Sequence, residues 1–159
     1  FILLMFFFPI IYLLCPIISI YLIKYEFGSN FLLFLVFIVW INDTSAFIIG
    51  KSIGKIKLSN ISPDKTIEGV ISSLCVCVLA SFFLINFLKL ETSINPFLLG
   101  AFISISSNFG DLLESFIKRK FKKKDSGKIM IGHGGILDRI DSLLVASPLF
   151  YIMLKIALN

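Results

Sequence analysis

Five runs of about twenty apolar residues divide this chain of 159 amino acids and restrict the folds it can adopt. An α-helix needs about 20 residues to cross the ~30 Å hydrocarbon core of a bilayer, and each run is close to that length. Hydrophobic residues make up 57% of the chain, and a soluble domain of this size has no interior able to bury so much apolar surface. The sequence therefore predicts an all-α, polytopic membrane helix bundle with about five transmembrane helices. The five runs cover residues 1–23, 31–50, 69–88, 96–117 and 139–157.

The basic residues concentrate in two of the four loops between these runs. Residues 51–68 and 118–139 together hold twelve of the fifteen lysines and arginines, whereas each of the other two loops pairs one lysine with one glutamate. The positive-inside rule then places the lysine-rich loops in the cytoplasm. The first run is uncharged and has no small-residue cleavage site, so it predicts a spanning helix rather than a signal peptide.

Eight of the ten acidic residues fall on the same side, in the basic loops or in the adjoining halves of the runs. Asp43 precedes Lys51 by eight residues, which places it about 12 Å inside a helix end. A carboxylate at that depth costs roughly 2.5–3.5 kcal/mol unless it is paired, hydrated or bound to a metal ion. The eight residues are Asp43, Asp64, Glu68, Asp111, Glu114, Asp125, Asp138 and Asp141.

Two sets of polar residues have the spacing of a single helix face. The first set is Asp111, Glu114, Ser115 and Lys118, and the second is Asp138, Asp141 and Ser142. One interpretation is that they form intramembrane salt bridges between helices. The other is a site in which carboxylates position Mg²⁺ while lysines and arginines neutralise a polyphosphate, as phosphoryl and nucleotidyl transfer require. Placement alone leaves both interpretations open and names no substrate.

The segment 115–141 holds twelve polar and glycine positions of one known signature: S-x-x-K-R, four residues, K-D-x-G, and then H-G-G-x-x-D-R-x-D. This pattern resembles the signature of the phosphatidate cytidylyltransferase family. Met130 and Ile131 stand where the family usually has an apolar residue followed by Pro or Gly. The matched residues are Ser115, Lys118, Arg119, Lys124, Asp125, Gly127, His133, Gly134, Gly135, Asp138, Arg139 and Asp141.

Three further stretches are similar to segments of the same family. They are Trp40–Ala46 followed by Gly50-Lys51 and Gly54-Lys55, the loop Ser62–Thr66 with Glu68-Gly69, and Gly110–Ser115. The resemblance covers about residues 31–157. Family members are normally longer at the N-terminus and this chain begins with Phe1 rather than Met, so we expect a fragment. We expect residues 1–30 to form an N-terminal helix with an outer loop, and residues 31–159 to form a catalytic transmembrane domain.

The resemblance implies transfer of the cytidylyl group of CTP to phosphatidic acid, giving CDP-diacylglycerol and pyrophosphate. It implies Mg²⁺ as cofactor and a second, monovalent ion such as K⁺. By this resemblance Asp111 and Asp138 belong to the metal centre with Asp141 close by, and Asp43 is a candidate further ligand. Lys118, Arg119 and Arg139 are expected to act on the phosphates in catalysis. The expected substrate-binding residues are Ser62, Lys65, Thr66, Lys124, Asp125, His133, Gly134 and Gly135.

The expected partners are CTP, phosphatidic acid, membrane lipids and a second copy of the chain, with no nucleic acid. The expected location is the bacterial inner membrane, with the catalytic loops facing the cytoplasm. Two other functions remain open. One is a CTP-dependent lipid kinase of the polyprenol type. The other is an ion or proton transporter lined by Asp43, Asp111 and Asp138, although the almost wholly apolar outer halves of the runs weigh against a transporter.

Overall fold

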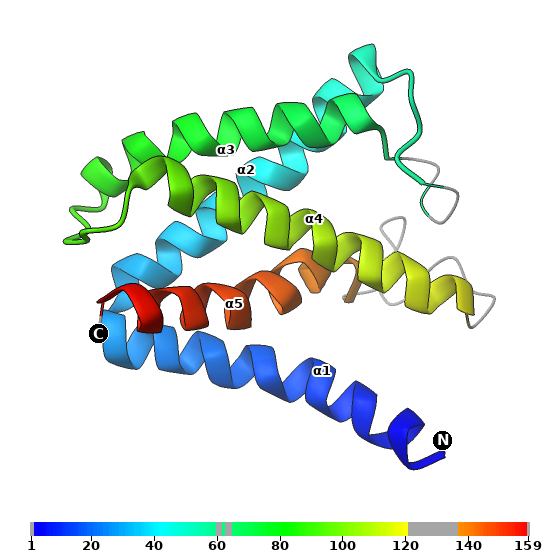
Figure 1. The fold of residues 1–159 in the computed structure, drawn as a ribbon, viewed down its shortest axis with the longest axis horizontal. Coiled ribbons are helices and arrows are strands. Elements are labelled where there is room, and N and C mark those ends of the chain that lie inside the picture. Colours follow the sequence, from blue (N-terminus) through cyan, green and yellow to red (C-terminus); the bar gives the residue numbers. More distant parts are fainter. Residues whose placement is uncertain (1, 60–61, 63–64, 121–136, 159) are drawn as a thin grey trace.

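The computed structural model describes the backbone of residues 2–59, 62, 65–120 and 137–158. Within these ranges it also describes the side chains, except those of residues 2–10 and 137–139. This part of the chain is helical (Figure 1). Its elements are α1 (Ile2–Leu22), the short π-helix η1 (Ile23–Phe27), α2 (Ser29–Ile53), α3 (Ile67–Phe87), α4 (Pro96–Lys120) and α5 (Leu137–Leu158).

Four helical segments of the described region are long and apolar enough to cross a membrane. They are Ser29–Ile53, Ile67–Phe87, Pro96–Lys120 and Ile140–Leu158. Large apolar side chains such as Phe83 and Phe87 are exposed on their outer surfaces, as expected where lipid is the solvent. The predicted all-α, polytopic membrane bundle is thereby confirmed. The first predicted run, 1–23, coincides with α1, which is helical from Ile2 to Leu22.

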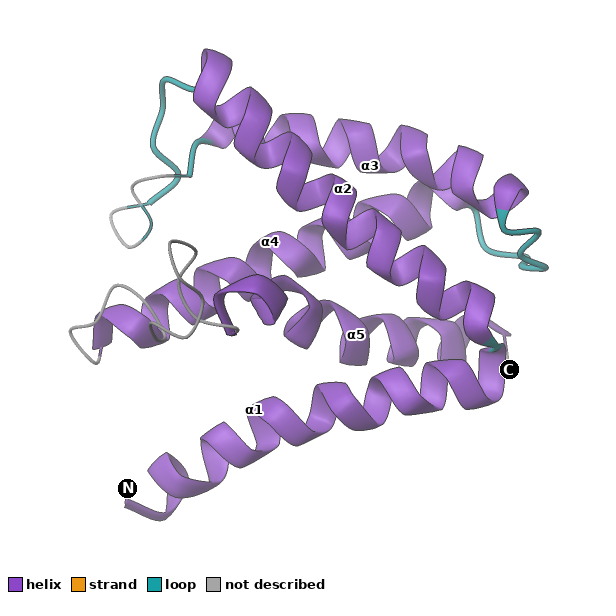
Figure 2. Ribbon diagram, turned by 180° about the vertical axis from the view of Figure 1, so that it is seen from behind, coloured by secondary structure: helices purple, strands orange, loops and turns teal. Residues whose placement is uncertain are grey.

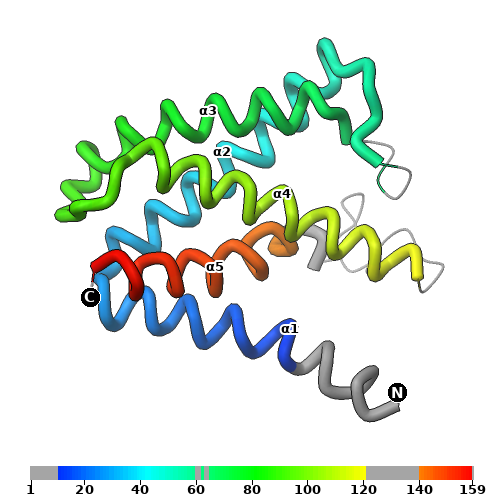
Figure 3. Tube along the Cα trace, viewed as in Figure 1, coloured from blue at the N-terminus to red at the C-terminus, as the bar shows by residue number. Residues whose placement is uncertain are grey.

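The helices form a bundle in which α5 lies between α4 and α1, as the chain trace in Figure 3 shows. Helix α2 packs mainly against α3, α3 against α4, α4 against α5, and α1 against α5. Seen from behind, α2 runs obliquely across the bundle (Figure 2) and therefore reaches α3, α4 and α5. The turn from η1 into α2 passes through Gly28, whose φ of 98° is a conformation that glycine adopts without steric cost.

Small residues allow α3, α4 and α5 to approach one another closely. Gly69, Ser73, Cys77 and Ser81 recur at every fourth position of α3 and are all buried. On α4, a Cβ added at Gly100 would lie 2.5 Å from the carbonyl oxygen of Cys77. In lipid, the hydrophobic effect does not drive helices together. Small residues at such seams stabilise the contact instead, because they allow close van der Waals packing of the helices. The seams also bring polar side chains on different helices within hydrogen-bonding distance.

Candidate active site: a carboxylate cluster on three helices

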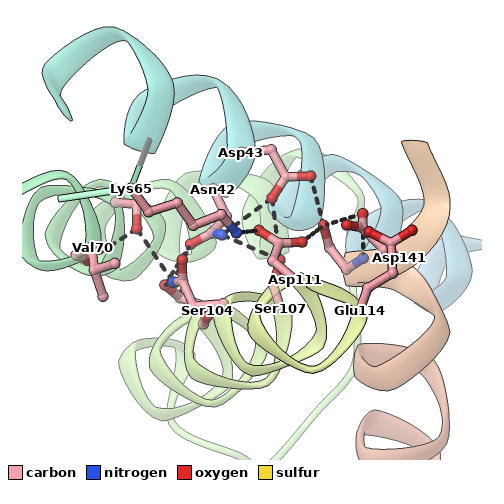
Figure 4. Close-up of polar contacts among 12 residues, drawn as sticks. Asn42, Asp43, Lys65, Val70, Ser104, Ser107, Asp111, Glu114 and Asp141 are labelled. Carbon is pink, nitrogen blue, oxygen red and sulfur yellow. Dashed lines mark hydrogen bonds and ion pairs between the residues drawn. The ribbon is translucent and has the colours of Figure 1, made fainter. Parts of the chain in front are cut away.

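Three predicted carboxylates from three helices meet around one serine hydroxyl. Ser142 Oγ on α5 lies 2.6 Å from Asp111 Oδ1 on α4, 3.0 Å from Asp43 Oδ2 on α2 and 3.4 Å from Asp141 Oδ1. Figure 4 shows Asp43, Asp111 and Asp141 converging from their separate helices. Because a hydroxyl has only one hydrogen to donate, it cannot satisfy three carboxylates at once. The hydroxyl therefore leaves carboxylate oxygens that it does not satisfy.

Lysines from two different elements neutralise part of this charge. Lys65, in the loop between α2 and α3, forms an ion pair with Asp111. Lys118 pairs with Glu114 one helical turn earlier, at 2.8 Å, and the side chain of Glu114 is only 3% exposed. With the carboxylates Asp43 and Asp141, the described cluster holds four acidic groups and two paired lysines. An additional positive charge would stabilise such a partly buried set.

Within the described residues, no three Asp, Glu, His or Cys side chains are arranged to hold a metal ion. The carboxylates of Asp43 and Asp111 nevertheless share the hydroxyl of Ser142, and oxygen ligands of this kind are those that Mg²⁺ prefers. The side chain of Asp138, another of the predicted ligands, lies outside the described residues. The predicted metal site therefore stays a prediction, with a donor set compatible with Mg²⁺.

A short hairpin holds Lys65 over the cluster. Leu58 N donates to the Lys65 carbonyl oxygen at 2.8 Å, and Ile67 N donates to the Ile56 carbonyl oxygen at 2.9 Å. The Glu68 carboxylate accepts the N–H of Ile56 with both oxygens at 3.2 Å. These bonds hold the limb that carries Lys65, residues 65–67, against the other limb, residues 56–58.

The predicted residues Thr66 and Ser62 have local roles in this hairpin. Thr66 caps α3, because its Oγ1 accepts the N–H of Gly69 at 3.2 Å. Ser62 bonds within the loop, with its N–H donated to Ser59 Oγ at 3.2 Å and its carbonyl oxygen accepting from Lys65 N at 3.2 Å. A role of either residue in binding substrate stays a prediction.

A buried polar network beneath the carboxylates was not predicted from the sequence. Asn42, fully buried on α2, accepts from Ser104 Oγ at 2.6 Å and from Asn108 Nδ2 at 3.2 Å. Its Nδ2 donates to Ser107 Oγ at 3.2 Å and to Asp43 Oδ1 at 3.3 Å (Figure 4). The signal in the sequence was the i, i+3, i+4 spacing of Ser104, Ser107 and Asn108 in the middle of an apolar run. The network fixes α2 on α4 next to Asp43.

Several predicted site residues lie outside this description. The side chains of Asp138 and Arg139 are not described, although both residues belong to the backbone of α5. Arg119 is described and lies exposed in the last turn of α4. The remaining predicted residues, all outside the described ranges, are Lys124, Asp125, His133, Gly134 and Gly135.

A third ion pair ties the far end of α5 to the turn between α1 and α2. Lys155 Nζ donates to Glu26 Oε2 at 2.7 Å, and Tyr151 Oη donates to Glu26 Oε1 at 3.0 Å. The hydrogen bond from Lys155, reinforced by that from Tyr151, lowers the pKa of the Glu26 carboxyl below its ordinary value. These contacts lie at the end of α5 opposite to Asp141 and Ser142.

Comparison with known proteins gives a consistent result. The model of the cytidylyltransferase family matches residues 2–157. The chain is 44% identical over 129 residues to a phosphatidate cytidylyltransferase of Staphylococcus haemolyticus (strain JCSC1435), covering 80% of this chain and 50% of that protein. It is 39% identical over 133 residues to a phosphatidate cytidylyltransferase of Bacillus subtilis (strain 168), covering 82% of this chain and 49% of that protein. The chain thus spans about half the length of the curated relatives it matches, and it belongs to the cytidylyltransferase family.

Proposed function

We propose that this chain carries the membrane-embedded catalytic part of a phosphatidate cytidylyltransferase. The reaction joins the phosphate of phosphatidic acid to the α-phosphorus of CTP and breaks the bond between the α- and β-phosphates. The products are CDP-diacylglycerol and pyrophosphate. The observation that carries the proposal is the convergence of Asp43, Asp111 and Asp141 from three helices, with Lys65 held among them. The names of the relatives supply the substrate class.

The described residues suit this chemistry because nucleotidyl transfer depends mainly on positioning and on neutralising charge. Asp43, Asp111 and Asp141, with Asp138, would hold Mg²⁺, which when bound supplies positive charge to the phosphate oxygens. Lys65 pairs with Asp111 from the hairpin, so its ammonium group can form an ion pair with a phosphate that binds next to these carboxylates. A K⁺ ion near the same carboxylates belongs to the proposal as well.

The lysine-rich loops complete the proposed site. Lys118 and Arg119 belong to the last turn of α4, which follows Asp111 and Glu114 in that helix, and Arg139 belongs to the first turn of α5. We assign them, with Lys124, to the phosphates of CTP and of the lipid. Asp125, His133, Gly134 and Gly135, with the hairpin residues Ser62 and Thr66, are assigned to the nucleotide. The loops face the cytoplasm in this proposal, because most of the basic residues lie there.

The location and assembly follow from the same reasoning. A bacterial plasma membrane is proposed from the bacterial origin of the relatives. Anionic membrane lipids and CTP are proposed as partners of the basic loops, while nucleic acid is not. Formation of a homodimer is part of the proposal and can be tested by the mass of the detergent-solubilised protein.

The decisive experiment is a mixed-micelle assay with phosphatidic acid, Mg²⁺ and CTP labelled in either the α- or the γ-phosphate. We expect the α-label to enter lipid and the γ-label to leave as pyrophosphate. Asp111→Asn should abolish both, whereas Glu91→Gln, an exposed carboxylate in a loop distant in sequence from the cluster, should leave both unchanged. Entry of the γ-label into lipid would instead show a lipid kinase. Folded protein that transfers neither label would refute the proposal for this chain.

A further inference from the structure

The hydroxyl of Ser142 joins helices α2, α4 and α5 at the carboxylate cluster. A serine in a helix can donate to a carbonyl oxygen one turn earlier, as Ser45 does to Ile41 at 2.6 Å, and such a bond stays within one helix. Ser142 Oγ reaches across to Asp111 Oδ1 on α4 at 2.6 Å and to Asp43 Oδ2 on α2 at 3.0 Å. Ser142 is only 2% exposed, so these contacts are shielded from solvent and lipid.

A glycine on α4 allows the short side chain of Ser142 to reach that helix. A Cβ added at Gly110 would lie 2.9 Å from the carbonyl oxygen of Asp141 and 3.2 Å from Ser142 Cα, so α4 and α5 pack backbone against backbone at this point. Asp111 follows Gly110 directly in the sequence. The close approach at Gly110 therefore brings the Asp111 carboxylate within reach of the serine hydroxyl.

The hydroxyl is one of two contacts that hold each of these carboxylates. Asp111 accepts from Ser142 with Oδ1 and pairs with Lys65 through Oδ2. Asp43 faces Ser142 with Oδ2, and its Oδ1 accepts from Asn42 Nδ2 at 3.3 Å. In Figure 4 the Asp43 and Asp111 carboxylates lie next to each other between α2 and α4. Loss of the hydroxyl would release one oxygen of each carboxylate and leave the other oxygen held.

We propose that Ser142 is a positioning residue whose hydroxyl keeps the Asp43 and Asp111 carboxylates together and thereby raises the affinity of the cluster for a divalent cation. Two carboxylates on separate helices repel each other, and a shared hydroxyl hydrogen reduces this repulsion before a cation binds. A group that orients metal ligands typically changes metal affinity or activity by about 10–100-fold. The use of the cation in catalysis rests on the proposed function, whereas the contacts of the hydroxyl do not.

Binding of Mn²⁺ tests this role without turnover, because Mn²⁺ favours the same oxygen ligands as Mg²⁺. Ser142→Ala removes the hydroxyl and keeps the backbone N–H, which donates to Asp141 Oδ1 at 2.9 Å. Free Mn²⁺ is measured by electron paramagnetic resonance in detergent-solubilised protein without CTP or lipid. We expect the Kd for Mn²⁺ to rise at least about ten-fold. The Mg²⁺ concentration that gives half-maximal transfer should rise by a similar factor, and excess Mg²⁺ should restore the rate.

Ser147→Ala is the matched control. Ser147 is fully buried on the same helix, and its hydroxyl forms no hydrogen bond with any residue that the structure describes. Its removal should change neither the Kd for Mn²⁺ nor the Mg²⁺ dependence. Ser142→Thr keeps a hydroxyl at the position of interest and should bind Mn²⁺ more tightly than Ser142→Ala. Circular dichroism establishes that each variant is folded before its affinity is compared.

The outcomes separate this role from the proposed function. Equal Mn²⁺ affinity in wild type and Ser142→Ala, equal losses in Ser142→Ala and Ser147→Ala, or wild-type protein that binds no Mn²⁺ would overturn the positioning role. A Mn²⁺ affinity that depends on Ser142 in protein that transfers no α-label to lipid would refute the proposed function and leave the positioning role standing. Active protein whose Mn²⁺ affinity is independent of Ser142 would do the reverse.

Discussion

Replacing Asn42 with leucine should destabilise the bundle because it removes the centre of the buried polar network. The side chain makes five hydrogen bonds to neighbouring side chains. It accepts from Ser104, from Asn108 and, over 3.8 Å, from the weakly donating Cys77 thiol, and it donates to Ser107 and Asp43. Leucine is similar in size to asparagine, so Asn42→Leu removes these bonds without opening a large cavity.

The expected loss can be calculated from the number of bonds. Hydrogen bonds between helices in a membrane contribute on average ~0.6 kcal/mol each, so the three bonds from Asn42 to Ser104, Ser107 and Asn108 of α4 correspond to about 1.8 kcal/mol. Part of this loss is recovered, because Asn108 keeps its bond to the Ser104 carbonyl oxygen at 2.9 Å and Ser107 keeps its contact with Asp43 at 3.3 Å. We therefore expect the free energy of unfolding to fall by about 1.5 kcal/mol.

Asn86→Leu is the matched control. Asn86 is exposed, and its Nδ2 donates only within its own helix, to the Phe82 carbonyl oxygen at 2.9 Å. This change should cost no more than about 0.5 kcal/mol, as surface substitutions usually do. The assay is reversible unfolding in mixed micelles of a mild detergent and sodium dodecyl sulfate, followed by circular dichroism. Equal losses for Asn42→Leu and Asn86→Leu, or no loss for either, would show that the network does not stabilise the fold.

Three further predictions concern the seam, the hairpin and the ion pair between Lys155 and Glu26. Gly100→Ala should lower the free energy of unfolding by about 1–3 kcal/mol, because the new methyl group overlaps the backbone of α3; unchanged stability would contradict the close packing. Glu68→Ala should reduce kcat by up to about 100-fold by releasing the hairpin that positions Lys65, with partial rescue in Glu68→Gln and no change in stability; kcat equal to that of the wild type would contradict this role. The lowered pKa of Glu26 means that its bond to Lys155 stabilises the protein above the ordinary carboxyl pKa of 4.5 and ceases to do so as the pH falls through the lowered value. Unfolding measured between pH 7 and acid should therefore show a smaller pH dependence in Glu26→Gln than in the wild type, and parallel curves would contradict the prediction.

The apolar runs predicted the helices well because the bilayer imposes a length that can be counted in the sequence. They did not predict how far the helices continue beyond the apolar part. The run 96–117 corresponds to Pro96–Lys120, and the run 31–50 corresponds to Ser29–Ile53. Polar residues such as Lys51 and Lys118 extend these helices, because a helix satisfies its own backbone hydrogen bonds in water as well as in lipid.

The sequence predicted which charged residues belong to the candidate site, but it did not predict which of them form ion pairs or hydrogen bonds with one another. Asp43 and Asp111 stood out because a carboxylate in an apolar run is costly. The ion pair between Lys65 and Asp111 joins residues 46 positions apart and depends on the fold of the hairpin, which no local pattern specifies. The uncharged residue Asn42 gave a weaker signal, because an amide in a span can be satisfied in several ways. Only the packing of α2 on α4 shows which of these is used.

The meeting of three carboxylates from three helices also fixes the depth at which they lie. Asp43 is 14 residues from the start of α2, Asp111 is 15 from the start of α4, and Asp141 is 17 from the end of α5. At 1.5 Å per residue these intervals are about 21–26 Å, shorter than a ~30 Å hydrocarbon core. A hydrocarbon core that begins at the far ends of these helices would therefore extend past the cluster, and α2 and α4, at 25 residues each, are long enough to tilt within it. In the proposed function, the thickness of the bilayer would then set how deep CTP must enter to reach these carboxylates, so the lipid composition of the membrane would affect the site without any change in its side chains.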